Sequence, residues 1–131
     1  MINKPKAIMN WSGGKDSALA LHAVLQADEY EVVGLLTTVT EGDGRISMHH
    51  VREALLDQQA AALGLPLIKA PIPAQASLAV YDNIMYQHLA PLVSAGVSHA
   101  IFGDLFLEDL KTYREQRLAE LNLTAVFPLW Q

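Results

Sequence analysis

The sequence W-S-G-G-K-D-S, residues 11–17, decides how the rest of the chain is interpreted. It follows an apolar stretch at Lys6–Trp11 that predicts a buried strand. It leads into a helical pattern that runs from Lys15 to about Ala27. Glycines, serines and a lysine in one turn between a strand and a helix are typical of a loop that binds phosphate. The sequence therefore predicts an α/β domain with an anion site after its first strand.

The residue types in this loop suit an anion. Gly13 and Gly14 can take positive φ angles and let backbone N–H groups approach an anion. The helix that follows directs its positive N-terminal end at the same place. Lys15 adds a full positive charge, and Ser12 and Ser17 add hydroxyl donors.

Asp16 is the residue that a simple anion site does not explain. A carboxylate here makes sense if a Mg²⁺ ion lies between it and the phosphates. The loop is not a Walker A loop, which needs G-x-x-x-x-G-K-[ST], and it lacks the G-x-G-x-x-G of dinucleotide-binding loops. The alternative is a glycine-rich turn with a capping serine, which the strand before it and the helix after it disfavour.

Beyond the loop, strand-like stretches alternate with helical patterns. The further strands are expected at Glu31–Val39, Leu65–Pro71, His99–Asp104 and Thr124–Trp130. The further helices are expected at Val51–Leu63, Leu78–Val93 and Asp109–Leu121. Gly64 is expected to end the second helix, Ser77 to cap the third, and Pro91 to lie at a kink or near the end of the third. The positions that set the apolar faces are Ala18, Leu19, Leu21, His22 and Leu25 in the first helix, and Val51, Leu55 and Ala62 in the second.

This alternation predicts the fold class. Strands that alternate with helices form a parallel sheet with helices on both faces. Right-handed crossovers make this an α/β, doubly wound, five-stranded parallel sheet of Rossmann-like type, with strand order 3-2-1-4-5. Ligands of such sheets bind beyond the carboxyl ends of the strands, at the switch point of the topology. We therefore expect Ser12–Ser17 and Gly103–Asp104 to meet there.

Composition limits the class of protein. A chain of 131 residues with 51% hydrophobic and 18% charged residues fits one globular domain. Its net charge of -5 provides no extended surface for nucleic acid. It has no cysteine, which excludes disulfides, iron–sulfur clusters and thiolate zinc sites formed by these residues. The apolar runs are too short for a membrane span or a signal peptide, so a cytoplasmic protein is expected.

The loop S-G-G-K-D-S after the first strand resembles the pyrophosphate-binding loop of the N-type ATP pyrophosphatases, the PP-loop superfamily. The resemblance implies the adenine nucleotide alpha hydrolase-like (HUP) architecture. It also implies binding of ATP with Mg²⁺ and cleavage of ATP between its α- and β-phosphates. An acid or amide oxygen is adenylated in such reactions, and a nucleophile then displaces AMP.

Other stretches narrow the resemblance. M-H-H-V-R (48–52), I-F-G-D-L-F-L-E-D-L (101–110) and F-P-L-W (127–130) are similar to the diphthine–ammonia ligase-like ATP-binding family, and the similarity covers essentially the whole chain. Eukaryotic and archaeal relatives amidate diphthine on elongation factor 2, whereas this sequence is closer to bacterial members. Members of the family usually continue past F-P-L-W into a smaller substrate region. The expectation is therefore a single PP-loop domain over 1–131 without that region, either a fragment or a minimal form. Dimerisation is one way to cover its apolar end.

The resemblance gives roles to residues outside the loop. The backbone at Thr37 and Thr38 is expected to meet adenine, while their side chains are interpreted as ordinary strand threonines. Gly103 is expected beside the nucleotide. Asp104 either holds Mg²⁺ or orients the acid that is activated, or else it caps a helix or turn. Arg114 either holds a substrate carboxylate and stabilises the adenylation transition state, or lies on a solvated helix face.

His49 and Arg52 are weaker candidates for a substrate pocket. The resulting hypothesis is an AMP-forming amide ligase with catalytic residues Lys15, Asp104 and Arg114. Its co-substrate is ATP, its acceptor is a small or protein-borne carboxylate, and its nucleophile is ammonia. Two alternatives remain open: a nucleotide-binding module without catalysis, and a tRNA-modifying PP-loop enzyme, which the acidic balance and missing cysteines disfavour.

Overall fold

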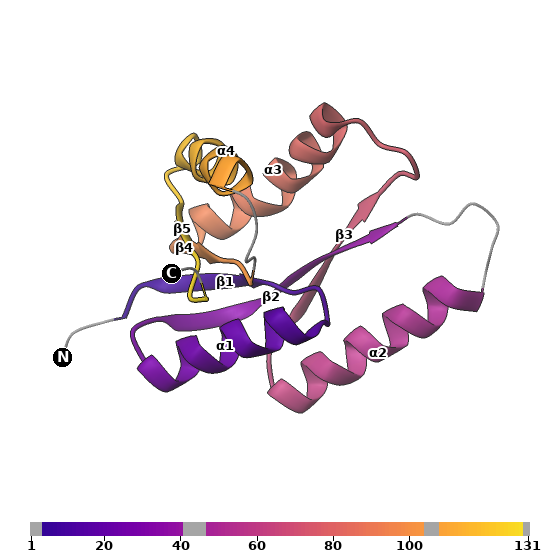
Figure 1. Cartoon of the computed structure of the whole chain (residues 1–131), viewed down its shortest axis with the longest axis horizontal. Coiled ribbons are helices and arrows are strands. Elements are labelled where there is room, and N and C mark those ends of the chain that lie inside the picture. The colour runs from indigo at the N-terminus through magenta and orange to yellow at the C-terminus, as the bar shows by residue number, and fades with distance from the viewer. Residues whose placement is uncertain (1–3, 41–46, 104–107, 130–131) are drawn as a thin grey trace.

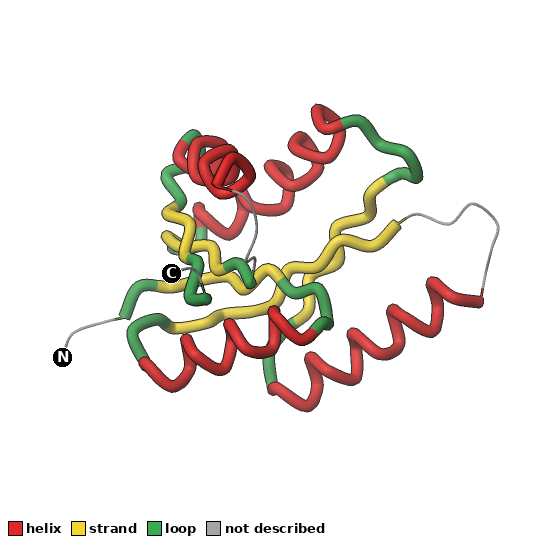
Figure 2. Tube along the Cα trace, viewed as in Figure 1, coloured by secondary structure: helices red, strands yellow, loops and turns green. Residues whose placement is uncertain are grey.

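The structure, a computed structural model, describes residues 4–40, 47–103 and 108–129, with only the backbone described at 47–52 and 108–110. The described residues form five strands and four helices that alternate along the chain (Figures 1 and 2). The strands are β1 (Lys6–Asn10), β2 (Glu31–Thr40), β3 (Leu67–Ile72), β4 (Val97–Ile101) and β5 (Thr124–Val126). The helices are α1 (Lys15–Ala27), α2 (Ser47–Leu63), α3 (Leu78–Ser94) and α4 (Glu108–Ala119).

The sheet is parallel throughout, and its strand order is β3-β2-β1-β4-β5. This confirms the predicted doubly wound α/β fold. The switch point lies at β1, which pairs with β2 on one side and with β4 on the other. At its carboxyl end Met9 is in register with Ile101 and Asn10 with Leu36, so the segments after β1 and β4 leave the sheet side by side.

Helices cover both faces of the sheet. Figure 1 shows α1 and α2 together on one face, and α3 and α4 on the other. Two apolar cores follow from this arrangement: one joins Met9 and Leu35 to Leu21 and Leu56, and the other packs Ile8 of β1 among residues of α3 and α4. Since alternate residues of β1 enter opposite cores, every residue from Ala7 to Met9 is buried.

The predicted face of α1 is confirmed at Leu21, whereas the other predicted positions are exposed. The buried residues are Ser17, Ala20, Leu21 and Val24, whereas Leu19 and Leu25 are about half exposed and His22 is exposed. The physical reason is the loop: Ser17 is hydrogen-bonded to Ser12, with 2.7 Å between the two hydroxyl oxygens, and this fixes the rotation of the helix. Ala20, Leu21 and Val24 then face the sheet together with Ser17.

Two of the three positions predicted to face inward in α2 do not, and the side chain of the third, Val51, lies outside the described set. Leu55 is 51% exposed and Ala62 is exposed, whereas Leu56 is 1% exposed and Ala60 is buried. Leu56 faces inward because α2 packs on the loop at Gly13, where an added Cβ would lie 3.1 Å from a Leu56 methyl carbon. Gly64 follows the helix with φ +69°, which confirms it as the stop.

The last two strands are shorter than predicted. β4 covers Val97–Ile101, and not His99–Asp104, because Gly96 with φ +104° turns the chain into the strand earlier. β5 ends at Val126 because its partner strand ends at Ile101, with which Val126 is in register. In α3 the Ser77 hydroxyl accepts a hydrogen bond from the Val80 N–H, which confirms the cap, and Pro91 lies in the last turn.

Candidate functional site

The loop after β1 is held by hydrogen bonds within itself. The Ser12 N–H donates to Ser17 Oγ at 3.2 Å, and the Gly14 N–H donates to Ser12 Oγ at 3.2 Å. Gly13 has φ +82°, but Gly14 has φ -92° and ψ -179°. Gly14 does not use the positive φ that glycine allows, because this residue is the extended N-cap of α1. The loop thus presents a fixed backbone to solvent at the positive end of a helix.

Helix α2 supports the loop from the side. Trp11 Nε1 donates to Gln59 Oε1 at 2.9 Å, and Gln59 Nε2 donates to the Gly13 carbonyl at 3.4 Å. Gln59 was not among the predicted site residues. Its position one helical turn after Leu56 could have indicated it only if the inward face of α2 had been known.

Gly103 packs directly against the loop. A Cβ at this position would lie 2.9 Å from the Asp16 carbonyl oxygen and 2.9 Å from the Ser17 backbone nitrogen. Real side chains do not reach such distances, so glycine is needed for the chain after β4 to pass the start of α1. The predicted meeting of the two segments at the switch point is confirmed for Gly103, whereas Asp104 lies outside the described residues.

A cavity of about 300 Å³ opens at this point, and we call it the switch cavity. Its lining includes the predicted residues Ser12, Asp16, Ser17, Thr37, Gly103 and Arg114. Gly13, Gly14 and Lys15 do not line it; Lys15 is exposed at the first turn of α1. The structure therefore gathers residues from β1, β2, α1 and α4 around one space, with the glycines and lysine of the loop outside it.

Thr37 contributes an unsatisfied polar group to this lining. It lies within β2, three residues before its end, and its side chain is 2% exposed. Its Oγ1 is buried without a hydrogen-bond partner among the described residues. A buried hydroxyl without a partner costs free energy, so a ligand or a water molecule is expected to complete it.

Asn10 is a lining residue that the sequence interpretation missed. Its Nδ2 donates to the Ile101 carbonyl at 3.1 Å, which ties the ends of β1 and β4 together. The signal for Asn10 in the sequence is a polar residue at the end of an apolar strand, just before the loop.

Arg114 is half-buried and not on a solvated face. Its guanidinium carbon lies 4.7 Å from the centre of the Phe102 ring, a cation–π distance. Because Phe102 follows β4 directly, this contact brings the positive charge of α4 to the switch cavity. Of the two predicted alternatives for Arg114, the structure therefore favours a pocket position.

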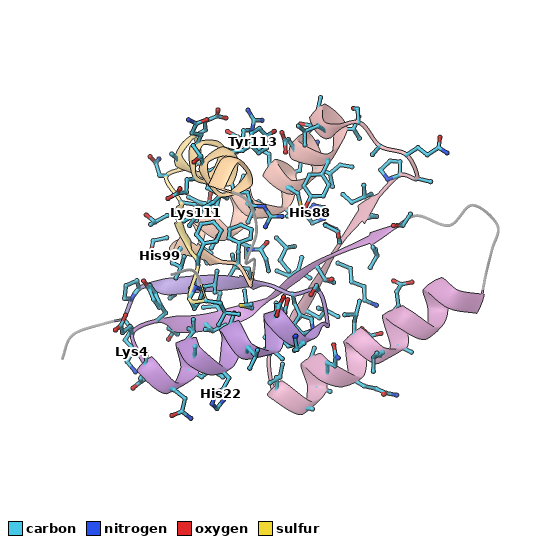
Figure 3. The ribbon with its side chains drawn as sticks, in the orientation of Figure 1. Lys4, His22, His88, His99, Lys111 and Tyr113 are labelled. Carbon is cyan, nitrogen blue, oxygen red and sulfur yellow. The ribbon has the colours of Figure 1, made fainter. Side chains whose placement is uncertain are left out.

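Tyr113 and Asp82 connect α4 to α3 next to this site. The Tyr113 hydroxyl donates to Asp82, which also pairs with Arg117 Nε at 3.4 Å. Figure 3 shows Tyr113 on the side of α4 that faces α3. The hydrogen bond to the Asp82 carboxylate raises the pKa of Tyr113, and burial raises it further.

Asp82→Asn is expected to lower the pKa of Tyr113 towards its ordinary value of 10.0, because the charge that favours the neutral phenol is lost. Since the folded pKa is raised, this hydrogen bond stabilises the fold fully below pH 10.0 and is lost as the pH rises through the folded pKa. A ¹³C NMR titration of the tyrosine ring carbons measures the shift. Glu115→Gln, on the same helix, is the control and should leave the titration of Tyr113 in place. An unchanged titration in the Asp82 variant would contradict the assignment.

His22, His88 and His99, the histidines whose side chains are described, do not line the switch cavity. His88 Nδ1 lies 2.9 Å from the Ile84 carbonyl oxygen, and His99 packs on Tyr30 with ring centres 5.0 Å apart. Burial lowers the pKa of His99. The side chains of His49, His50 and Arg52 lie outside the described set. Among the described residues there is also no cluster of three metal-ligating side chains, and no helix is long and apolar enough to cross a membrane.

Comparison with known proteins gives one clear result. Residues 5–124 match the protein family described as the diphthamide synthase N-terminal domain. The match covers both segments of the switch cavity and all the strands up to the start of β5. The search of curated proteins returned no match.

Proposed function

The chain belongs to the family of diphthamide synthase N-terminal domains, of the PP-loop type, and from that premise we propose that it binds ATP and forms an amide with release of AMP. The observation that carries the proposal is the contact of Gly103 with the Ser12–Ser17 loop around the switch cavity. The described residues form one sheet, and both apolar cores contain residues of its strands. This supports the proposal that the chain is a single ATP-binding domain.

The residues present fit an adenine nucleotide. The unsatisfied Thr37 hydroxyl supports adenine or ribose binding beside β2, a larger role than the ordinary strand position expected for its side chain. The positive N-terminal end of α1 and the exposed Lys15 suit the phosphates of ATP. In this proposal the phosphates lie outside the apolar part of the switch cavity.

A magnesium ion fits the same place. Asp16 is the carboxylate of the loop that lines the switch cavity, and it would hold the ion together with phosphate oxygens and water. When bound, Mg²⁺ neutralises part of the charge that develops on the departing pyrophosphate. The positive charge of Lys15 also stabilises the departing pyrophosphate.

The proposed reaction has two steps. A carboxylate oxygen of the acceptor forms a bond to the α-phosphorus of ATP, and the bond to the bridging oxygen of the β-phosphate breaks, so that pyrophosphate leaves with the electron pair. The nitrogen of ammonia then bonds to the acyl carbon, AMP leaves with the carboxylate oxygen, and a proton passes to solvent. Arg114 holds the carboxylate, and catalysis rests on positioning and charge stabilisation.

An isotope experiment tests this proposal. The protein is incubated with ATP, Mg²⁺, ammonia and a panel of ¹⁸O-labelled carboxylic acids, and the products are separated by mass spectrometry. AMP that carries one ¹⁸O atom, with pyrophosphate in equal amount, is the expected result. Formation of ADP and phosphate would exclude the proposal. Tight ATP binding without turnover of any acid would favour a nucleotide-binding module without catalysis.

A further inference from the structure

Gly13 is the point at which the Ser12–Ser17 loop touches α2. A Cβ added to Gly13 would lie 3.1 Å from Gln59 Oε1 and 3.1 Å from a Leu56 methyl carbon. These two side chains are three residues apart in α2, so they lie on the same face of the helix. The loop is therefore in close contact with α2 at Gly13, and Gln59 is the polar side chain of that contact.

Gln59 holds the peptide that joins Gly13 to Gly14. Its Nε2 donates to the Gly13 carbonyl oxygen at 3.4 Å. In a trans peptide the carbonyl and the following N–H point in opposite directions, so the Gly14 N–H points away from Gln59. That N–H donates to Ser12 Oγ at 3.2 Å. The peptide is thus held from two sides, by α2 through its carbonyl and by the loop through its N–H.

The orientation of this peptide sets the start of α1. Gly14 is the N-cap, its carbonyl accepts a hydrogen bond from the Ala18 N–H at 3.1 Å, and its side of the helix has no side-chain cap. The first N–H groups of a helix have no acceptor within the helix, and a bound anion can accept from them. A change in the Gly13–Gly14 peptide would therefore redirect the groups that face the phosphates in the proposed function.

Trp11 fixes which way the Gln59 amide is turned. The indole Nε1 donates to Gln59 Oε1 at 2.9 Å, and Trp11 is 6% exposed. An indole N–H can only donate, so the amide has to present its oxygen to Trp11. The opposite orientation would leave a buried N–H without an acceptor, which costs free energy. With the oxygen on Trp11, the amide nitrogen is left for the Gly13 carbonyl.

We infer that Gln59 is a positioning residue for the phosphates of ATP. It does not line the switch cavity, and it acts by holding the loop in the orientation that binds the β- and γ-phosphates. The inference rests on the proposed function, because it takes Ser12–Ser17 as the phosphate site. Its effect should be found with ligands that contain a pyrophosphate group. AMP, which lacks the β- and γ-phosphates, should be affected little.

The experiment uses inorganic pyrophosphate as the probe, with ATP and AMP as companions. Affinities are measured by calorimetry in the presence of Mg²⁺ for the wild-type chain and for Gln59→Met, which keeps the length of the side chain and removes both hydrogen bonds. The control is Gln58→Met, at an exposed neighbouring position of the same helix. Urea unfolding of each variant measures stability separately from affinity.

A further pair of variants guards against simple misfolding. Gln59→Met leaves the Trp11 N–H buried without an acceptor, which destabilises the chain. In a Trp11→Phe background the same substitution leaves no such group, so it should cost less stability. The Gly13 carbonyl loses its partner in both backgrounds. The loss of pyrophosphate affinity should therefore be the same in both.

Gln59→Met is expected to weaken pyrophosphate and ATP binding by about fivefold and to change AMP binding by no more than about twofold. Gln58→Met should bind all three as the wild-type chain does. A Gln59→Met chain that is less stable but keeps the wild-type affinity for pyrophosphate would overturn the inference, since the role would then be structural only. An equal loss for AMP, or a wild-type chain that binds neither pyrophosphate nor ATP, would also overturn it. The expected pattern for pyrophosphate, with no AMP formed in the isotope experiment, counts against the proposed amide formation alone.

Discussion

Replacing Lys15 with alanine is expected to weaken ATP binding by about 10- to 100-fold and to change AMP binding by no more than about twofold. Lys15 opens α1 and is exposed outside the switch cavity, so in the proposed arrangement it meets the β- and γ-phosphates. A hydrogen bond between charged groups is worth about 1.5–3 kcal/mol, which corresponds to this loss. AMP lacks both phosphates and does not make that contact. Calorimetric titration of each nucleotide with Mg²⁺ measures the difference.

Lys6→Ala is the matched control for this measurement. Lys6 is also an exposed lysine, but it begins β1 and so lies at the other end of the strand from the loop. ATP affinity should be the same in this variant as in the wild-type chain. If Lys15→Ala bound ATP normally, the loop would not be the phosphate site. An equal loss for ATP and AMP would instead place Lys15 at the α-phosphate.

The sequence was sufficient for the order of the elements and for the meeting of the segments that follow β1 and β4. Strands and helices alternate visibly, and the right-handed crossover leaves few topologies, so the order 3-2-1-4-5 followed. The rule that ligands bind at the switch point then placed Gly103 beside the Ser12–Ser17 loop, as the structure has it. These predictions needed only periodicity and topology.

The sequence was not sufficient for side-chain direction. That Ser17 is 5% exposed and bonded to Ser12 could not be foreseen from the sequence, and this one bond sets the face of α1. Gln59 and Asn10 were missed because each acts through a partner far along the chain, Trp11 for Gln59 and Ile101 for Asn10. Periodicity describes a helix by itself, whereas these positions depend on tertiary contacts that fix its rotation.

Gly103→Ala is expected to weaken ATP and AMP binding together and to lower the free energy of unfolding by about 1–3 kcal/mol. The added Cβ would lie 2.9 Å from three backbone atoms, the Asp16 carbonyl oxygen and the Ser17 nitrogen and Cα. A backbone cannot rotate away as a flexible side chain can, so the loop itself has to move. Urea unfolding measures the stability, and the same nucleotide titrations measure the affinities.

Gly14→Ala is the control, because Gly14 has φ -92° and its nearest neighbour to an added Cβ is Ser12 Oγ at 3.5 Å. It should cost no more than about 1 kcal/mol, from the weaker N-cap. A Gly103 variant as stable as the wild-type chain, with normal affinities, would contradict the close approach of the two segments. The two variants also separate two roles of the loop. Loss of the Lys15 charge should weaken ATP binding but not AMP binding. Displacement of the loop backbone by Gly103→Ala should weaken both, because in the proposed arrangement the α-phosphate and the adenosine lie at the contact between the segment after β4 and the start of α1.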